Sequence, residues 1–168
     1  MKWQSSCVCL NLRRAARAVS QIYDEALAAS GIKITQFSLL RAVERNEPAA
    51  ITALAEELDL DRTTMARNLA PLERDGMVTL ATGSDQRVTE VCLTAKGRAV
   101  VAKAYPLWEK AQAEIARRLP AGRIDQLREI ANESIGIAAA FGQQGTTERA
   151  RSRTATRPAK PGARRGRR

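Results

Sequence analysis

The chain has 168 residues, carries a net charge of +10 from 28 Lys and Arg against 18 Asp and Glu, and contains no His. Without His, a Ser–His or Cys–His catalytic pair and an imidazole metal site are excluded, and three Cys are too few for a four-thiolate zinc site. We therefore expect no metal and no cofactor. An apolar fraction of 44% and a charged fraction of 27% are ordinary for one soluble domain.

No window approaches the roughly 18 uninterrupted apolar residues of a membrane-spanning helix, and the N-terminal residues lack the apolar run of a signal peptide. We expect a cytoplasmic protein without membrane contact. In that compartment Cys7, Cys9 and Cys92 are expected to be free thiols, because disulfide frameworks are rare there.

Positive charge is concentrated at the C-terminal end. Residues 143–168 hold nine basic residues and one acidic residue, a net charge of +8, whereas residues 1–142 carry only +2. The segment has no apolar side chain larger than Ala, so it cannot bury enough surface to offset the entropy of ordering. We predict a disordered basic tail that is either functionally neutral or attracted to nucleic-acid phosphates in a salt-dependent way.

Helical periodicity begins near the N-terminus. A first helix is predicted from near Ser6 to Ser30, ended by Gly31. Its apolar stripe consists of Leu12, Ala16, Val19, Tyr23 and Ala26.

The next apolar stripe predicts a second helix that begins after Thr35, a plausible N-cap, and stops before Pro48. Leu39, Leu40 and Val43 are expected on its inner face.

Two short helices then follow in close succession. The first is marked by the apolar residues Ile51, Leu54, Ala55 and Leu58. The second is capped by Asp61, is ended by Gly76, and faces inward with Met65, Leu69 and Leu72. The three-residue turn 59–61 between the two helices is typical of a helix-turn-helix. Pro71 lacks an N–H group, so we expect a distorted last turn there.

After Gly76 the apolar period changes from helical to alternating. Residues 77–81 and 88–94 are rich in β-branched and apolar residues and flank the polar stretch 82–87. Val78 and Leu80 alternate in the first segment, and Val91 and Leu93 alternate in the second. This pattern predicts a β-hairpin with a mobile tip, with Cys92 on its exposed or half-exposed side.

Two long helices complete the pattern. Thr94 is expected to cap the first helix, which Pro106 should bend, and the second follows Pro120. Their apolar stripes are Val101, Ala104, Leu107, Trp108, Ala111 and Ile115 in the first and Ile124, Leu127, Ile130, Ala131, Ile135 and Ala138 in the second.

The order of elements predicts a mainly α-helical fold with a small β-hairpin wing. Residues 35–94 form a winged helix-turn-helix unit, and residues 1–34 and 95–142 form a helical region outside it. The apolar stripes of that outer region need a cover, and a second copy related by a two-fold axis supplies one. We therefore expect a homodimer with N- and C-terminal dimerisation helices.

Several linked motifs carry a family resemblance over roughly residues 9–140. They are Leu54-Ala55-Glu56-Glu57-Leu58, Asp61-Arg62-Thr63-Thr64, Leu72-Glu73-Arg74-Asp75-Gly76-Met77-Val78, Asp85-Gln86-Arg87 and Leu93-Thr94-Ala95-Lys96-Gly97. The chain resembles the MarR family of bacterial winged-helix transcription regulators. The resemblance implies a dimer, recognition of double-stranded DNA by the fourth helix in the major groove and the wing in the minor groove, and control by a small ligand or by thiol oxidation.

Helical geometry independently predicts the DNA-facing side of the fourth helix. With its leucines inward, a 100° step per residue places a polar set on the opposite side, with Asn68 at its margin. The candidate contacts of this helix are Thr63, Thr64, Arg67, Asn68 and Arg74. Arg pairs with guanine or phosphate, Asn matches adenine, and Thr suits phosphate oxygens or the thymine methyl group. The alternative is an ordinary solvated face.

In the wing, Asp85 lies two residues before Arg87 and is expected to hold the guanidinium of Arg87 by a charge-assisted hydrogen bond. The resemblance implies that this Arg reaches the minor groove, where narrow A·T-rich segments concentrate negative potential. The alternative is a surface salt bridge. A dimer predicts an inverted-repeat operator with half-sites about one helical turn apart, near 10 bp.

Thiol oxidation is one predicted trigger for release. Ser6 as N-cap would place Cys7 and Cys9 in the first helical turn, where the helix dipole favours a thiolate, with Arg13 one turn further on. By resemblance to the peroxide-sensing OhrR branch, Cys9 matches the reactive Cys and Tyr23 one thiol-orienting Tyr.

The second OhrR Tyr is replaced by Ile34, with Phe37 where a further ring is expected. Cys7 reaches Cys9 only with local unwinding of the helix. The alternative is that both Cys are small fillers.

A small aromatic effector is the other predicted trigger. Tyr23, Phe37, Tyr105 and Trp108 are the aromatic residues expected to line a cleft between the winged unit and the outer helices, although aromatics at helical spacing also form cores. Two other functions stay open: an architectural protein that coats DNA without sequence preference, and a small thiol peroxidase built on Cys9, for which no His supplies a proton.

Overall fold

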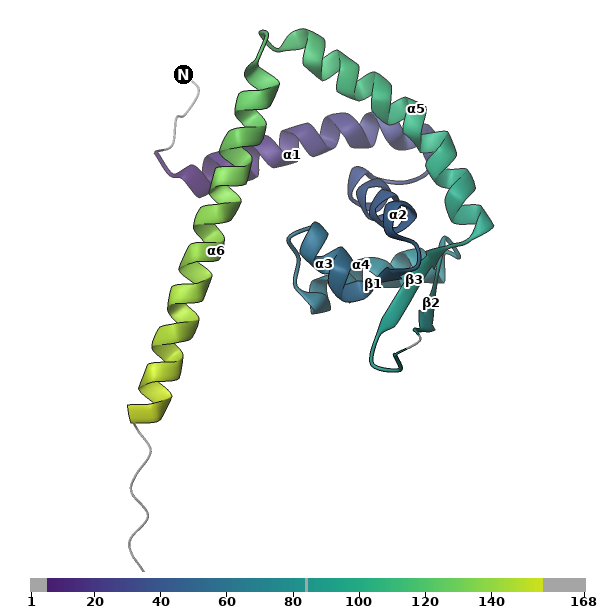
Figure 1. Cartoon of the computed structure of the whole chain (residues 1–168). Helices are drawn as coiled ribbons and strands as arrows, with labels where there is room; N and C mark the ends of the chain where they lie inside the picture. The colour runs from purple at the N-terminus through teal and green to yellow at the C-terminus, as the bar shows by residue number, and fades with distance from the viewer. Residues whose placement is uncertain (1–5, 84, 156–168) are drawn as a thin grey trace, which may run out of the picture. The chain divides into compact units, whose positions relative to one another are not determined.

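The computed structural model describes residues 6–83 and 85–155, with side chains described up to residue 141. The chain divides into two compact units, residues 1–117 and residues 118–168. Within the described residues the fold is mainly helical, with one small antiparallel sheet (Figure 1). The predicted fold class is therefore confirmed for the single chain.

The first helix, α1, spans Val8–Leu27 and continues as the 3-10 turn η1, Ala28–Ser30. Gly31 follows with φ of 80°, a left-handed conformation that ends the helix as the sequence predicts. The predicted cap is wrong, because Cys7 and not Ser6 occupies the N-cap position, and its side chain makes no capping hydrogen bond.

The second helix, α2, spans Ile34–Asn46. The predicted N-cap, Thr35, lies inside the helix, because other side chains satisfy the first N–H groups. The N–H of Ile34 donates to Asp24 Oδ1 at 2.8 Å, and the N–H of Lys33 donates to Gln36 Oε1 at 3.0 Å.

The predicted helix-turn-helix is confirmed as α3, Ile51–Glu57, followed by α4, Arg62–Arg74. Asp61 caps α4 through the N–H of Thr64, which donates to Asp61 Oδ1 at 2.9 Å. Pro71 does not end α4, since the helix continues to Arg74 and the N–H of Asp75 donates to the Pro71 carbonyl at 2.9 Å.

The wing consists of β2, Val78–Thr82, and β3, Thr89–Leu93, with Val78 opposite Leu93 and Leu80 opposite Val91. Ser84, in the predicted mobile tip, lies outside the described residues. A strand that the sequence did not predict, β1, Ala49–Ala50, pairs with β3 and gives the sheet order β1-β3-β2. Two alanines leave no alternating pattern that would indicate it.

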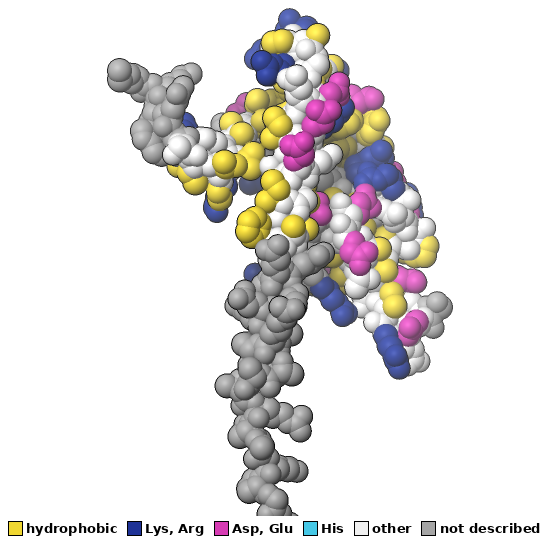
Figure 2. Space-filling view, turned by 60° about the vertical axis from the view of Figure 1, so that its left-hand side comes forward, with side chains coloured by type: hydrophobic (Ala, Val, Ile, Leu, Met, Phe, Trp, Pro, Cys, Tyr) yellow, Lys and Arg dark blue, Asp and Glu magenta, His cyan; other side chains and the backbone are white. Residues whose placement is uncertain are grey.

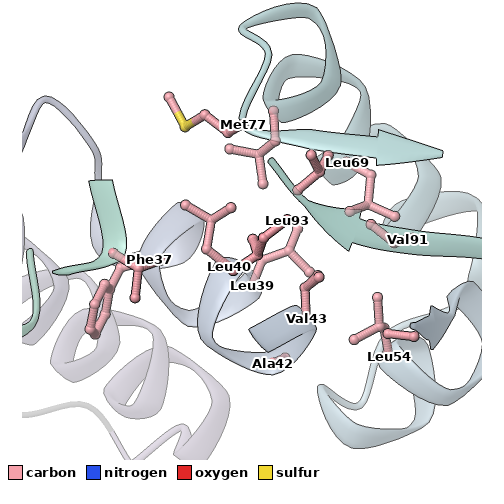
Figure 3. Close-up of a cluster of buried hydrophobic side chains, with 14 of the residues drawn as sticks. Phe37, Leu39, Leu40, Ala42, Val43, Leu54, Leu69, Met77, Val91 and Leu93 are labelled. Atoms are coloured by element: carbon pink, nitrogen blue, oxygen red, sulfur yellow. The ribbon is translucent and has the colours of Figure 1, made fainter. Parts of the chain in front are cut away.

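The core of the winged unit lies between α2, α3, α4 and the sheet (Figure 3). Leu40, Leu54 and Leu69 are completely buried there. Each removes a leucine side chain from water, a gain of about 1.5–3 kcal/mol. This core orients α4 and the wing, which carry the predicted DNA contacts.

Helix α5 spans Ala95–Arg118 and begins as predicted at Thr94, whose hydroxyl accepts a hydrogen bond from the N–H of Gly97 at 3.0 Å. Val101, Ala104 and Ala111 are buried on the predicted face. Pro106 lies inside the helix, which continues past it.

The second unit contains α6, Arg123–Ala155. Because α6 continues past residue 142, residues 143–155 are helical where the composition predicts disorder; this stretch contains no Pro to stop a helix. Residues 156–168 of the predicted tail lie outside the described residues. None of the described helices is long and apolar enough to cross a membrane.

Candidate nucleic-acid interface

Helix α4 separates a buried face from a polar face. Met65, Leu69 and Leu72 have no exposed surface, whereas Thr63, Arg67 and Asn68 on the other side are exposed. The predicted face of the helix is therefore open to a partner. Because the leucines fix the rotation of α4 about its axis, they also fix where Arg67 points.

Thr64 has a different environment from its predicted neighbours. It is half-buried, and its hydroxyl donates to Asp61 Oδ2 at 2.6 Å. This hydrogen bond and the N–H of Thr64 hold the pKa of Asp61 below its ordinary value. Thr64 therefore builds the start of α4, and its hydroxyl proton is already used within the protein.

Arg74 lies at the last residue of α4, where its Nε is 3.6 Å from Asp75 Oδ1. The side chain of Arg74 is 77% exposed, so this pair is a weak surface contact that does not bury the guanidinium. Arg74 stays accessible at the end of α4 opposite to Thr63.

In the wing, Asp85 contacts Arg87 in another way than predicted. Asp85 Oδ1 accepts a hydrogen bond from the backbone N–H of Arg87 at 3.0 Å, and the Asp85 carbonyl accepts one from Val88 at 2.9 Å. The carboxylate therefore fixes the turn and not the guanidinium. The reason is local: an Asp side chain reaches the N–H two residues ahead in an Asx turn. Arg87 itself is exposed.

The charges of the winged unit are distributed unevenly over its surface. Residues 35–94 contain six Arg, no Lys and ten acidic residues, a net charge of −4. Three of the six are salt-bridged to carboxylates: Arg41 to Glu44, Arg45 to Glu57 and Arg74 to Asp75. In the described part of the unit, Arg62, Arg67 and Arg87 have no carboxylate within salt-bridge distance, and all three belong to α4 or the wing.

The predicted thiol site is only partly assembled in one chain. Cys7 and Cys9 form no disulfide and lie exposed at the start of α1. Tyr23 lies fourteen residues after Cys9 on the same helix, about 21 Å along its axis. The Tyr23 hydroxyl instead donates to Gln112 Oε1 of α5 at 2.5 Å, and burial raises its pKa. Within one chain, Tyr23 therefore does not orient Cys9.

Three of the four predicted aromatic residues lie together. The rings of Phe37 and Trp108 are 6.0 Å apart between centroids, and those of Tyr105 and Trp108 are 5.7 Å apart. They line a cavity of about 340 Å³ between α2 and α5, to which Leu58 also contributes. Tyr23 does not line it.

Two arginines that the sequence analysis did not single out complete this cavity. Arg41 and Arg45 line it, and the guanidinium of Arg41 stacks 4.8 Å above the Tyr105 ring. Their spacing of four residues on α2, on the same face as Phe37, is a signal that would have found them.

Proteins of known structure have the same overall fold. The chain is 40% identical to the M. tuberculosis transcriptional regulator MosR, in a crystal structure of its complex with DNA; the match covers 80% of this chain and 98% of MosR, with a TM-score of 0.73. A family model described as the MarR family matches residues 30–87. The chain belongs to the MarR family. It is therefore a transcription regulator of a non-enzymatic family, and the thiol peroxidase hypothesis is set aside.

Two further MarR-family structures have the same fold. A second crystal structure of MosR is 39% identical, with a TM-score of 0.68 over 80% of this chain and 98% of that one. MarR from E. coli, in its apo form, is 20% identical, with a TM-score of 0.60 over 78% of this chain and 98% of that one. No curated protein sequence matched the chain.

Proposed function

We propose that this MarR-family protein is a homodimeric regulator, most simply a repressor, that binds an inverted-repeat operator through α4 and the wing. The observation that carries the proposal is the distribution of free arginines. The winged unit has a net charge of −4. Within its described residues, the arginines without a carboxylate within salt-bridge distance are Arg62, Arg67 and Arg87, and all three lie on α4 or the wing. MosR, the relative with 40% identity, is described in complex with DNA.

We assign DNA binding and dimerisation to the regions whose boundaries the sequence predicts. Residues 35–94 present Thr63, Arg67 and Asn68 to the major groove, and the wing places Arg87 at the minor groove and the phosphates that border it. Thr64 and Asp85 hold the start of α4 and the turn of the wing, and Arg74 lies at the end of α4 beside these contacts. A protein that regulates transcription in this way acts in the cytoplasm, on the nucleoid.

Residues 1–34 and 95–142 are proposed to form the dimer. In the single chain, α1 leaves Leu12 39% exposed and Ile22 47% exposed, and α6 leaves Leu127, Ile130 and Phe141 more than half exposed. Hydrophobic side chains are visible on these helices in Figure 2. Apolar surface of this extent is covered when the same stripe faces its own copy. Sedimentation at micromolar concentration should give twice the chain mass, and a stable folded monomer would contradict the dimer.

The DNA contacts are tested with paired variants. Genomic fragments bound by the protein are selected and sequenced, and the enriched site is used for affinity measurements. Arg67→Ala and Arg87→Ala should each weaken operator binding at least tenfold while the circular dichroism spectrum and dimer mass stay unchanged. Arg117→Ala on α5, whose partner Glu114 lies on the same helix, is the matched control and should bind normally. Unchanged binding by both test variants would overturn the assignment.

An architectural protein is distinguished by competition. A sequence-specific regulator should keep a preference of about 10³ or more for its site over random duplex at moderate salt. A protein that coats DNA would show no preference, which would overturn the proposal.

The aromatic cavity is proposed as the effector site. Phe37, Tyr105 and Trp108 offer stacking surface, and Arg41 and Arg45, although paired with Glu44 and Glu57, keep further guanidinium N–H donors for a carboxylate ligand. Aromatic carboxylates screened against the operator complex should release DNA. The release should be lost in Trp108→Ala and kept in a Tyr23→Phe control, because Tyr23 does not line the cavity. Equal release from both variants would place the effector elsewhere.

Oxidation of Cys9 is the proposed alternative trigger. Cys9 is exposed in the first turn of α1, where peroxide can reach its thiol. Peroxide should release DNA from the wild type and from Cys92→Ser but not from Cys9→Ser. Equal release of DNA by peroxide from Cys9→Ser and from the wild type would overturn this trigger.

A further inference from the structure

A small recess lies where α3, α4 and the wing meet. Its lining residues are Ile51 and Thr52 of α3, Arg62 at the start of α4, and Arg87, Val88 and Thr89 of the wing. These residues belong to three separate elements of the winged unit (Figure 1).

The recess gathers positive charge with no compensating carboxylate. Within the described residues, neither Arg62 nor Arg87 has an acidic side chain within salt-bridge distance, and no acidic residue lines the cavity. Two neighbouring cations repel each other, whereas an anion placed between them attracts both. The two threonines can add hydroxyl donors to the same anion.

The size of the recess restricts the anion. Its volume is about 40 Å³, which accommodates only one or two water-sized groups. An aromatic effector does not fit, but one or two oxygens of a phosphate group do. Arginine, with its planar fork of donors, is suited to phosphate in this geometry.

We propose that Arg62 and Arg87 together clamp one backbone phosphate of the operator, with Thr52 and Thr89 as additional donors. This inference rests on the proposed function, because it names a contact within the same DNA interface. This assigns a role in DNA binding to Arg62. Arg62 of α4 and Arg87 of the wing then bind the same phosphate of the DNA backbone. The clamp carries no base information, so it sets how the wing docks beside α4 and not which sequence is read.

A double-mutant cycle tests whether the two arginines share a phosphate. Arg62→Ala and Arg87→Ala should each weaken binding about tenfold, to the operator and to random duplex alike, and lower the slope of log K against log salt by about one. The double variant should lose much less than the hundredfold expected for independent sites. Additive losses with a slope reduced by two would overturn the shared clamp.

The phosphate itself is located with operator duplexes that carry one uncharged methylphosphonate at a time. At one backbone position per half-site, the substitution should weaken binding by the wild type and by Arg67→Ala, but leave binding by the double variant Arg62→Ala, Arg87→Ala unchanged. A scan in which this double variant stays sensitive to every position that weakens the wild type would overturn the inference.

Failure of the inference is separable from failure of the proposed function. If the wild type shows no preferred site, the proposed function fails. If it binds one site specifically but Arg62→Ala binds as well as the Arg117→Ala control, only the clamp is wrong. Thermal unfolding of Arg62→Ala checks that the variant is folded, since Arg62 is exposed at the first position of α4.

Discussion

The carboxylate of Glu47 is bound by both terminal nitrogens of Arg98, at 2.6 Å from Nη1 to Oε2 and 2.9 Å from Nη2 to Oε1. Glu47 Oε1 also accepts the backbone N–H of Leu93 at 2.8 Å. The side chain of Glu47, the residue after α2, thus binds both the end of β3 and the first turn of α5. The hydrogen bonds from Arg98 are the main reason that the pKa of Glu47 is lowered.

Glu47→Gln should destabilise the protein in a pH-dependent way. The folded-state pKa of Glu47 is lower than its ordinary value of 4.5, so its contribution is fully present above that value and is lost as pH falls through the folded-state pKa. At pH 7 the variant should unfold roughly 2–4 °C below the wild type. Near pH 3 the difference should shrink. A constant difference between pH 3 and pH 7 would show that the charge of Glu47 contributes nothing.

Gly97 is required by a close backbone approach. A Cβ added at this residue would lie 2.0 Å from the Met77 carbonyl oxygen, which also accepts the N–H of Thr94 at 3.0 Å and is not free to move away. Gly97→Ala should therefore destabilise the fold by about 1–3 kcal/mol in denaturant unfolding. The control, Gly136→Ala in α6, meets no atom within 4 Å and should be neutral or stabilising by up to about 1 kcal/mol. Equal effects of the two changes would contradict the packing argument.

The capping interaction of Asp61 links stability to recognition. Asp61→Ala removes the acceptor for the N–H and hydroxyl of Thr64, so the first turn of α4 should fray and the thermal midpoint should fall. Operator binding should weaken about threefold to tenfold, because Arg62 and Thr63 lie in that turn. Asp61→Asn keeps an acceptor and should lose less. If Asp61→Asn were as weak in binding as Asp61→Ala, the carboxylate charge and not the cap would be the cause.

The helices and the wing could be predicted because their signals are local. Spacing of apolar residues locates α4 and its inward face, and Gly31 and Asp61 mark a helix end and a helix start by their own conformations. Contacts between distant residues leave no such trace. The Asp24 carboxylate accepts the N–H of Ile34, so α2 begins at Ile34 and not after Thr35 as the sequence predicts.

The candidate site shows the same limit. Exposure of Arg67 follows from helical period, whereas the recess shared by Arg62 and Arg87 requires the tertiary packing of α3, α4 and the wing. Sequence spacing also suggested that the Asp85 carboxylate holds the Arg87 guanidinium, but the nearby backbone N–H competes for that oxygen and is found there instead.

The basic C-terminal segment should supply the long-range attraction that the winged unit lacks. Residues 35–94 carry a net charge of −4, so the unit as a whole is repelled by DNA phosphates, although Arg62, Arg67 and Arg87 lie on α4 or the wing without a carboxylate within salt-bridge distance. Residues 156–168 hold six basic residues and no acidic residue, a net charge of +6 that lies beyond the end of α6.

Truncation after Ala155 removes this charge while keeping every residue of α6. Affinity for random duplex should fall steeply, and the salt slope should decrease by up to about 0.9 for each phosphate that the segment no longer neutralises. Operator affinity should fall by a similar factor, so the ratio of specific to random binding stays nearly constant. A control chain with the six basic residues replaced by Gln should behave like the truncation, because the effect depends on charge and not on length. Loss of the specificity ratio would show that the segment reads sequence.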